Sequence, residues 1–191
     1  MKKLTKTERG PIYQIKISLD DVRPPIWRRV QTPASTSLAK LHRIVQRAME
    51  WTNSHLYAFN VGAVTYGNPQ HPSLDDWMVN ERGVRLSQVA PEEKSKICYE
   101  YDFGDGWGHT ILVEKILPSE EGQTYPRCLT GRRACPPEDC GGPWGYAEFL
   151  EALADPTHES HASLLEWLGS DFDPAAFDLA AVNANLAKLR F

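Results

Sequence analysis

Several features are missing from this sequence, and the absences exclude whole classes of protein. No run of about 18 apolar residues occurs, so no segment is long and apolar enough for a membrane span. The first residues, MKKLTKTERGP, are basic but lack the apolar stretch of about 7–15 residues that a secretory signal requires. No internal repeat and no low-complexity tract is visible. We therefore expect a globular, cytoplasmic protein without a membrane partner.

The length and composition predict one folded domain. The chain has 191 residues, whereas a domain takes about 150, so one domain with a tail fits better than two. Charged residues make up 24% and hydrophobic residues 41%, which argues against global disorder. We expect a flexible N-terminal segment over residues 1–10. A single domain then covers 11–191, with its C-terminal helical part at 144–190.

Charge is distributed unevenly along the chain, although the net charge is only −4. Residues 1–50 hold 11 Lys and Arg against 4 Asp and Glu, whereas residues 101–191 hold 6 against 15. A basic first quarter attracts an anion or a nucleic acid. Alternatively, the acidic second half of the chain neutralises it after folding.

The hydrophobic pattern predicts strands first and helices last. Residues 11–20 and 26–32 alternate apolar and polar residues, which favours an antiparallel pair of strands. Further strands are expected at 55–66, at 84–86, and in a hairpin of 97–103 and 107–117 around Gly104-Asp105-Gly106. The segments 67–83 and 118–143 are predicted to be loops, and the first of these contains Trp77.

Helical spacing appears once in the first half of the chain, at residues 37–51, and then again after residue 143. The later helices are expected at 144–154, at 156–168, and from Asp173 or Asp178 to about Leu189. Segregated strands and helices indicate the α+β class. The predicted fold is an antiparallel sheet with one helix from the N-terminal half packed on it and a C-terminal helical cap.

Three of the four cysteines form the first candidate site. Cys128, Cys135 and Cys140 lie within thirteen residues, and in a cytoplasmic protein such a cluster favours metal binding over disulfides. Zn²⁺ takes four ligands, usually thiolates and imidazoles. The fourth ligand would be His109, with His158 or His161 as alternatives. The competing interpretation is a loop with three thiols and no metal. The fourth cysteine, Cys98, is expected to be a small buried residue in a strand.

The hairpin carries the second candidate site. Asp102, Asp105 and His109 offer two carboxylates and an imidazole, which serve acid–base catalysis or hold a metal. Alternatively, Asp105 is present because Asp-Gly favours a turn, and His109 packs or caps. Glu138 and Asp139 precede the helix at 144, where acidic residues complement the helix dipole, and we assign them that role.

Basic residues form the third candidate site. Lys40, Arg43 and Arg47 lie on one flank of the predicted helix at 37–51, and Arg28 and Arg29 lie on the preceding strand. Together they predict contacts with the phosphates of a nucleic acid. A solvated helix face is the alternative explanation. An exposed aromatic residue beside them, with Trp77 as the best candidate, would add a platform for base stacking.

Five segments together resemble one protein family. They are IKISLDDVRPPIWRRV, the hairpin YDFGDGWGHTILVE, RRACPPEDCGGPWGYAEFLEAL, DPTHESHASLLEWLG and FDPAAFDLAAVN. Over residues 10–187 the sequence is similar to the plasmid pRiA4b ORF-3-like family, and GDGW-x-H combined with PPEDCGG is the specific part of the match. The resemblance implies a compact α+β domain and a protein associated with plasmids or other mobile elements. It implies no particular reaction.

Some members of that family are labelled as resolvases or transposon passenger proteins. Serine recombinases need a nucleophilic serine in a particular N-terminal context, supporting arginines and a helix–turn–helix. Ser18, within QIKISLDD, does not match that context, and no helix–turn–helix is predicted before residue 140. Resolvase activity is therefore not expected.

The sequence leaves three functional hypotheses. The leading one is a non-enzymatic binding module, for a nucleic acid, that uses the five basic residues. The alternative is a metal-dependent hydrolase, with Zn²⁺ as its cofactor, built from the hairpin residues and the cysteine loop. A third hypothesis is a protein–protein adaptor. The metal hypothesis requires the hairpin and the cysteine-bearing segment to meet in space at the edge of a shared sheet.

Overall fold

The computed structural model describes residues 10–68, 78–169 and 172–189. Residues 1–9 of the expected flexible segment at 1–10, and most of the loop at 67–83, including Trp77, lie outside the described residues. Among the described helices, none combines the length and the apolarity needed to cross a membrane.

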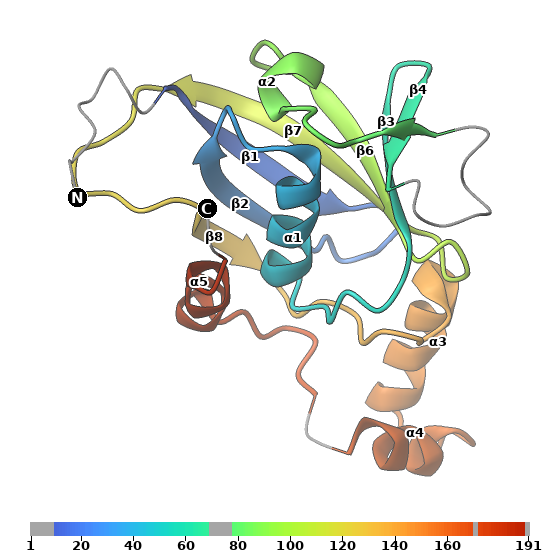
Figure 1. Ribbon diagram of the computed structural model, residues 1–191. Coiled ribbons are helices and arrows are strands. Elements are labelled where there is room, and N and C mark those ends of the chain that lie inside the picture. Colours follow the sequence, from blue (N-terminus) through green and yellow to red (C-terminus); the bar gives the residue numbers. More distant parts are fainter. Residues whose placement is uncertain (1–9, 69–77, 170–171, 190–191) are drawn as a thin grey trace.

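An eight-stranded sheet forms the centre of the molecule, in the order β5-β4-β3-β6-β7-β1-β2-β8 (Figure 1). The strands are β1 (Ile12–Leu19), β2 (Trp27–Pro33), β3 (Tyr57–Val61), β4 (Val64–Gly67), β5 (Val79–Asn80), β6 (Lys96–Tyr101), β7 (Trp107–Leu117) and β8 (Arg127–Arg132). All neighbouring strands run antiparallel except the pair β4 and β5. The predicted β1–β2 pair and the β6–β7 hairpin are therefore confirmed, and the hairpin lies in the middle of the sheet.

The described part of the chain contains five helices, so the fold is of the mixed α/β kind. They are α1 (Leu38–Ala48), α2 (Leu86–Val89), α3 (Gly142–Ala154), α4 (His161–Leu168) and α5 (Leu179–Ala187). Helix α1 crosses one face of the sheet (Figure 1). It begins at Ser37, whose hydroxyl accepts a hydrogen bond from the amide of Lys40 at 3.4 Å. Its apolar stripe shares one core with the inward-facing side chains of the strands, and this core extends from Tyr13 to Leu186.

The three C-terminal helices do not form one cap. Helix α5 packs against β8 and α1, whereas α3 and α4 pair with each other and extend away from the sheet (Figure 1). None of the residues of α4 is buried, and Trp144 and Trp167 are 88% and 51% exposed. Helix α5 therefore covers the same side of the sheet as α1, while α3 and α4 extend away from it and α3 stays joined to the core through Tyr146 and Phe149.

Several expectations about local structure were wrong. The predicted loop at 118–143 contains β8, an edge strand that pairs with β2, and its sequence RCLTGR has no apolar alternation to indicate a strand. The predicted strand at 84–86 leads into α2, with only an isolated bridge between Arg85 and Ser37. Helix α4 starts at His161 rather than at residue 156. Cys98 is exposed because its position in β6 faces away from the core.

Candidate functional site

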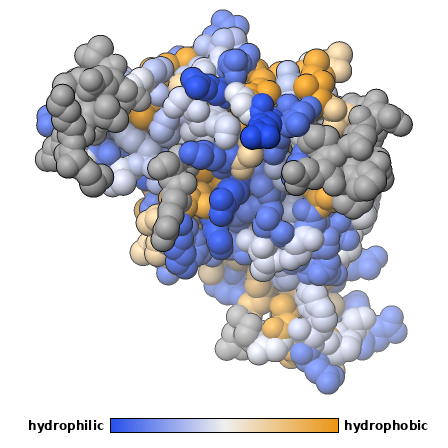
Figure 2. Space-filling model, viewed as in Figure 1, coloured by the Kyte–Doolittle hydropathy of each residue, from blue (hydrophilic) through white to orange (hydrophobic). Residues whose placement is uncertain are grey.

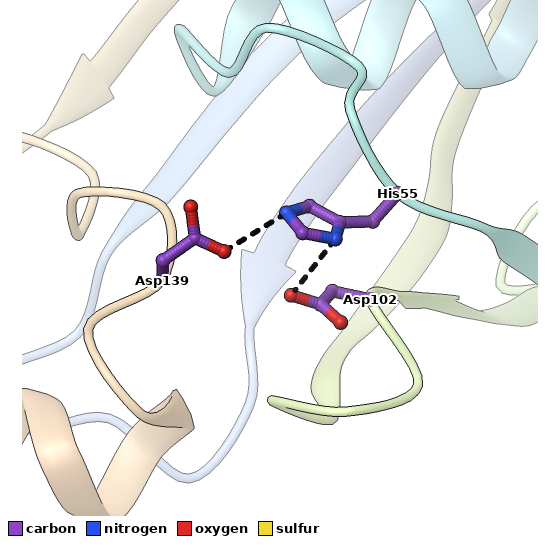
Figure 3. A group of neighbouring side chains, drawn as sticks. All are labelled: His55, Asp102 and Asp139. Carbon is purple, nitrogen blue, oxygen red and sulfur yellow. Dashed lines mark ion pairs between the residues drawn. The ribbon is translucent and has the colours of Figure 1, made fainter.

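Three side chains from distant parts of the sequence meet beside the tip of the β6–β7 hairpin (Figure 3). His55 precedes β3, Asp102 directly follows β6, and Asp139 lies in the loop before α3. His55 Nδ1 is 3.5 Å from Asp102 Oδ2, and His55 Nε2 is 3.1 Å from Asp139 Oδ1. One ligand atom from each residue can be chosen so that all three lie within 4.8 Å of one another. We call this group the His55–Asp102–Asp139 cluster.

The turn of the hairpin fixes the position of Asp102. Its backbone adopts a left-handed conformation, with φ 57°. Its Oδ1 accepts hydrogen bonds from the amides of Gly104, at 3.0 Å, and Asp105, at 3.4 Å. An aspartate that bonds its own turn in this way is a common turn-forming device. Because Oδ1 is used inside the turn, Oδ2 is the oxygen that faces His55.

Asp139 is positioned because its loop lies directly on the hairpin turn. The amide of Gly141 donates a hydrogen bond to Asp105 Oδ2 at 3.1 Å. Gly142, with φ 69°, lies so close to the turn that an added Cβ atom would be 2.1 Å from the carbonyl oxygen of Asp105. The hairpin therefore meets the cysteine-bearing segment, as expected, at Asp105, Gly141 and Gly142, but it does so at the tip of a central hairpin and not at an edge of the sheet.

We predict that Gly142→Ala destabilises the protein by roughly 2 to 3 kcal/mol, since it adds both a strained positive φ and a clash with backbone. Gly62→Ala is the matched control: Gly62 also has a positive φ, of 58°, but an added Cβ atom would meet nothing within 4 Å. Urea unfolding should show a loss of about 1 kcal/mol for the control. Equal losses in the two variants would contradict the close contact of the loop with the hairpin.

A second network ties the loop to the segment that carries His55. The hydroxyl of Tyr101 donates to Glu138 Oε1, and the amide and hydroxyl of Thr52 donate to Glu138 Oε2. The amide of Ser54 in turn donates to the Tyr101 hydroxyl at 3.0 Å. Burial and the Glu138 carboxylate raise the pKa of Tyr101, so the phenol keeps its proton and remains a donor. Glu138 therefore connects segments of the chain, which we had not expected of it.

The imidazole of His55 lies between the two carboxylates (Figure 3). Its Nε2 atom is buried, and the contact with Asp139 lacks the directional geometry of a hydrogen bond. The side chain of Asp139 is 70% exposed, so the cluster opens to solvent on that side. One imidazole and two carboxylates are a donor set for a divalent cation. A carboxylate beside the second imidazole nitrogen is the usual partner of a metal-bound histidine.

A cleft of about 610 Å³ opens beside Asp139, between its loop and the helices α3 and α4. Its walls combine acidic residues such as Glu148 with the aromatic rings of Phe149 and Trp167. These two rings meet edge to face, with centroids 6.3 Å apart. The cluster therefore adjoins a space large enough for a small molecule or a few residues of a larger one.

The structure does not bring the predicted cysteine ligands together with an imidazole. In the described part of the chain, no group of three metal-type ligands includes a cysteine. Cys128 contacts the carbonyl of Thr130, and Cys135 lies in the core against Met49. Burial raises the pKa of Cys128 to about 11 and that of Cys135 and Cys140 to about 12. Protonated thiols are poor metal ligands, because binding requires the thiolate.

The predicted histidine ligands have other contacts. His109 is fully buried on β7, its Nδ1 lies 3.0 Å from the carbonyl oxygen of Trp107, and its ring meets Trp51 edge-on. Burial lowers the pKa of His109 to about 4, so the imidazole is neutral. His161 Nδ1 lies 2.7 Å from the carbonyl oxygen of Ala152, and His158 Nδ1 accepts from the amide of Ser160. Of the catalytic candidates Asp102, Asp105 and His109, only Asp102 belongs to the cluster.

The five basic residues of the predicted nucleic-acid site do not share one surface. Arg28 is completely buried under the ring of Phe177 and donates to the carbonyls of Ala48, Trp27 and Arg132. Arg29 lies on the opposite face of the sheet and forms a two-pronged bond with Glu114, at 2.6 and 2.8 Å. The three remaining residues, Lys40, Arg43 and Arg47, are exposed on α1.

Two members of the cluster, His55 and Asp139, were not among the candidates. His55 stands at the start of a predicted strand, and Asp139 had a sufficient local explanation in the helix dipole. No spacing in the sequence connects them, since 84 positions separate the two residues. Only the docking of the PPEDCGG loop on the hairpin brings them together.

These features define a mixed α/β protein with an imidazole–dicarboxylate cluster at the tip of its central hairpin. The chain belongs to the plasmid pRiA4b ORF-3-like family, whose model matches residues 11–181. It is 46% identical over 173 residues to the uncharacterized protein y4hQ of Sinorhizobium fredii strain NBRC 101917 / NGR234, covering 90% of this chain and 89% of that protein. It also resembles the crystal structure of MM3350, a protein of unknown function from Methanosarcina mazei Go1. That match has a TM-score of 0.81 and 39% identity, and covers 88% of this chain and 96% of that one.

Proposed function

We propose that the protein is a metal-dependent hydrolase whose divalent cation is held by His55, Asp102 and Asp139. The observation that carries the proposal is the convergence of three metal-type ligand atoms within 4.8 Å of one another, from three separate segments of the chain. Hydrogen bonds outside the cluster hold these segments together. They are the bond from the Gly141 amide to Asp105 and the bonds from Thr52 and Tyr101 to Glu138.

The arrangement of the three ligands favours catalysis over a structural metal site. A structural zinc site usually takes four protein ligands, whereas three ligands leave a coordination position for water. Because the side chain of Asp139 is exposed, that water would bind on the side of the cluster that is open to solvent. A bound Zn²⁺ would lower the pKa of a coordinated water to about 7 and so supply a nucleophile near neutral pH.

The hydrolytic step follows from that chemistry. A cation held by His55, Asp102 and Asp139 would activate water for attack on an electrophilic atom of the substrate, and the departing group would leave with a proton from that water. The carboxylate oxygen of Asp139 that does not face His55 would accept the first proton. The cleft beside Asp139 provides the room for the substrate.

Zn²⁺ and Mn²⁺ suit the ligand set best. Imidazole favours Zn²⁺ and other transition metals, whereas carboxylates also accept Mn²⁺ and Mg²⁺. A test is to strip the protein with EDTA, dialyse it, and titrate it with Zn²⁺, Mn²⁺, Mg²⁺ and Ca²⁺ by isothermal calorimetry. We expect one Zn²⁺ or Mn²⁺ ion per chain, and metal-dependent release of nitrophenol from nitrophenyl esters or phosphodiesters. If no divalent ion binds at millimolar concentration, the imidazole between two carboxylates is a structural ion pair and the proposal fails.

A further inference from the structure

We infer that the face formed by α1, α2 and α5 is a docking surface for the sugar–phosphate backbone of a nucleic acid. All three helices lie on the same side of the sheet (Figure 1). Figure 2, in the same view, shows hydrophilic side chains gathered over α1. This surface is separate from the metal-type cluster, so the inference does not depend on the proposed hydrolase activity.

The charged residues of the three helices have a single sign. The sequences of α1, α2 and α5 contain no Asp or Glu within the bounds of the helices. The basic residues are Lys40, Arg43 and Arg47 of α1, Arg85 at the start of α2, and Lys188 at the end of α5, and all five are exposed. An ordinary solvated helix surface carries both positive and negative side chains, because pairs of opposite charge three or four residues apart stabilise a helix. Three neighbouring helices with only positive charge, in a protein of net charge −4, therefore need another explanation.

Internal ion pairs do not neutralise these arginines. In the described part of the chain, no ion pair includes Arg43, Arg47 or Arg85. The acidic residues that directly flank α1 and α5, Glu50 and Asp178, have partners of their own. Glu50 lies 3.4 Å from Arg28, and the carboxylate of Asp178 caps the first turn of α5.

The geometry of α1 fits an extended polyanion. Lys40, Arg43 and Arg47 are spaced at i, i+3 and i+7, so they lie along one face and span about 10 Å of helix axis. Arg85 extends this row, because the backbone at Arg85 bridges to Ser37, immediately before α1. A row of this length reaches several successive phosphates of a strand, whereas a single small anion would use only one or two of the side chains.

The test is fluorescence anisotropy with a labelled 20-base-pair DNA duplex, and with single-stranded DNA and RNA of the same length. EDTA is present throughout, so the result is independent of any bound metal. Contact with three to five phosphates predicts a slope of about −3 to −5 in a plot of log affinity against log salt concentration. Arg43→Gln and Arg47→Gln should each lower affinity about tenfold near 0.1 M NaCl and reduce the slope by about 0.9.

Lys16→Gln is the matched control, since it removes one positive charge from the opposite face of the sheet. Lys16 lies on β1 between Ile15 and Ile17, which are both buried in the core, and its amine lies over Trp27. This variant should bind like the parent protein, and equal melting temperatures should confirm that all variants fold. The inference is overturned if no nucleic acid binds at 20 mM NaCl, or if Lys16→Gln loses as much affinity as Arg43→Gln.

Discussion

Replacement of His55 with alanine is expected to weaken Zn²⁺ binding by about 100-fold or more. The imidazole is the only nitrogen ligand of the cluster, and loss even of a residue that merely orients a metal ligand costs about 10- to 100-fold. Asp139→Asn, which keeps the shape of the side chain but removes its charge, should have an effect of similar size. The Zn²⁺ affinities of both variants are measured by calorimetric titration of EDTA-treated protein. The folded state should survive, since Asp139 is largely exposed and His55 partly so.

Asp173→Asn is the control for these variants. Asp173 is an exposed aspartate whose carboxylate accepts from the amide of Ala175, a role that asparagine also fills. Asp173 lies outside the cluster, so the Zn²⁺ affinity of the Asp173→Asn variant should equal that of the parent protein. If His55→Ala binds Zn²⁺ as tightly as Asp173→Asn does, the ion is held elsewhere in the chain.

Acidification from pH 6.5 to 4 is expected to cost about 3 kcal/mol of stability for each of two buried histidines. Burial lowers the pKa of both His42 and His109 to about 4, whereas the same imidazoles in the unfolded chain titrate near 6.5. Between these values the unfolded state binds more protons than the folded state, so the free energy of unfolding falls as the pH falls. Burial raises the pKa of the carboxyl groups of Glu81 and Asp20, which acts in the opposite direction.

Two measurements check this prediction. Urea unfolding at pH 7 and at pH 4.5 should give a midpoint that drops sharply in acid. NMR titration of the imidazole signals should show two of the six histidines without a transition above pH 5. If all six histidines titrate near pH 6.5, the burial of His42 against Tyr57 and of His109 against Trp51 is contradicted.

Several elements of the fold follow from patterns that are local in the sequence, and these were predictable. The alternation in β1 and β2, the turn at Gly104-Asp105-Gly106 and the apolar stripe of α1 each predict an element on their own. Strand β8 was not predictable in this way. It is an edge strand with few apolar residues, and its pairing with β2 depends on contacts about 100 positions apart in the sequence.

The candidate site could be predicted only in part, for a related physical reason. The hairpin identifies Asp102, and the resemblance to the family emphasises the hairpin and the PPEDCGG loop. However, the close approach of Gly142 to Asp105 decides which residues of that loop face the hairpin, and it brings in Asp139 rather than the cysteines. The burial of Arg28 was equally hidden, because an arginine whose charge is satisfied by backbone carbonyls looks like any other arginine in a sequence.

Anomalous X-ray diffraction from crystals grown with Zn²⁺ tests the central claim most directly. Data collected on both sides of the zinc absorption edge locate the ion without reference to any assumed ligand. The account predicts one strong peak per chain, about 2.0 to 2.2 Å from a ring nitrogen of His55 and from one carboxylate oxygen each of Asp102 and Asp139. A peak at Cys128, Cys135 or Cys140, or no peak at His55 in crystals that contain Zn²⁺, would contradict it.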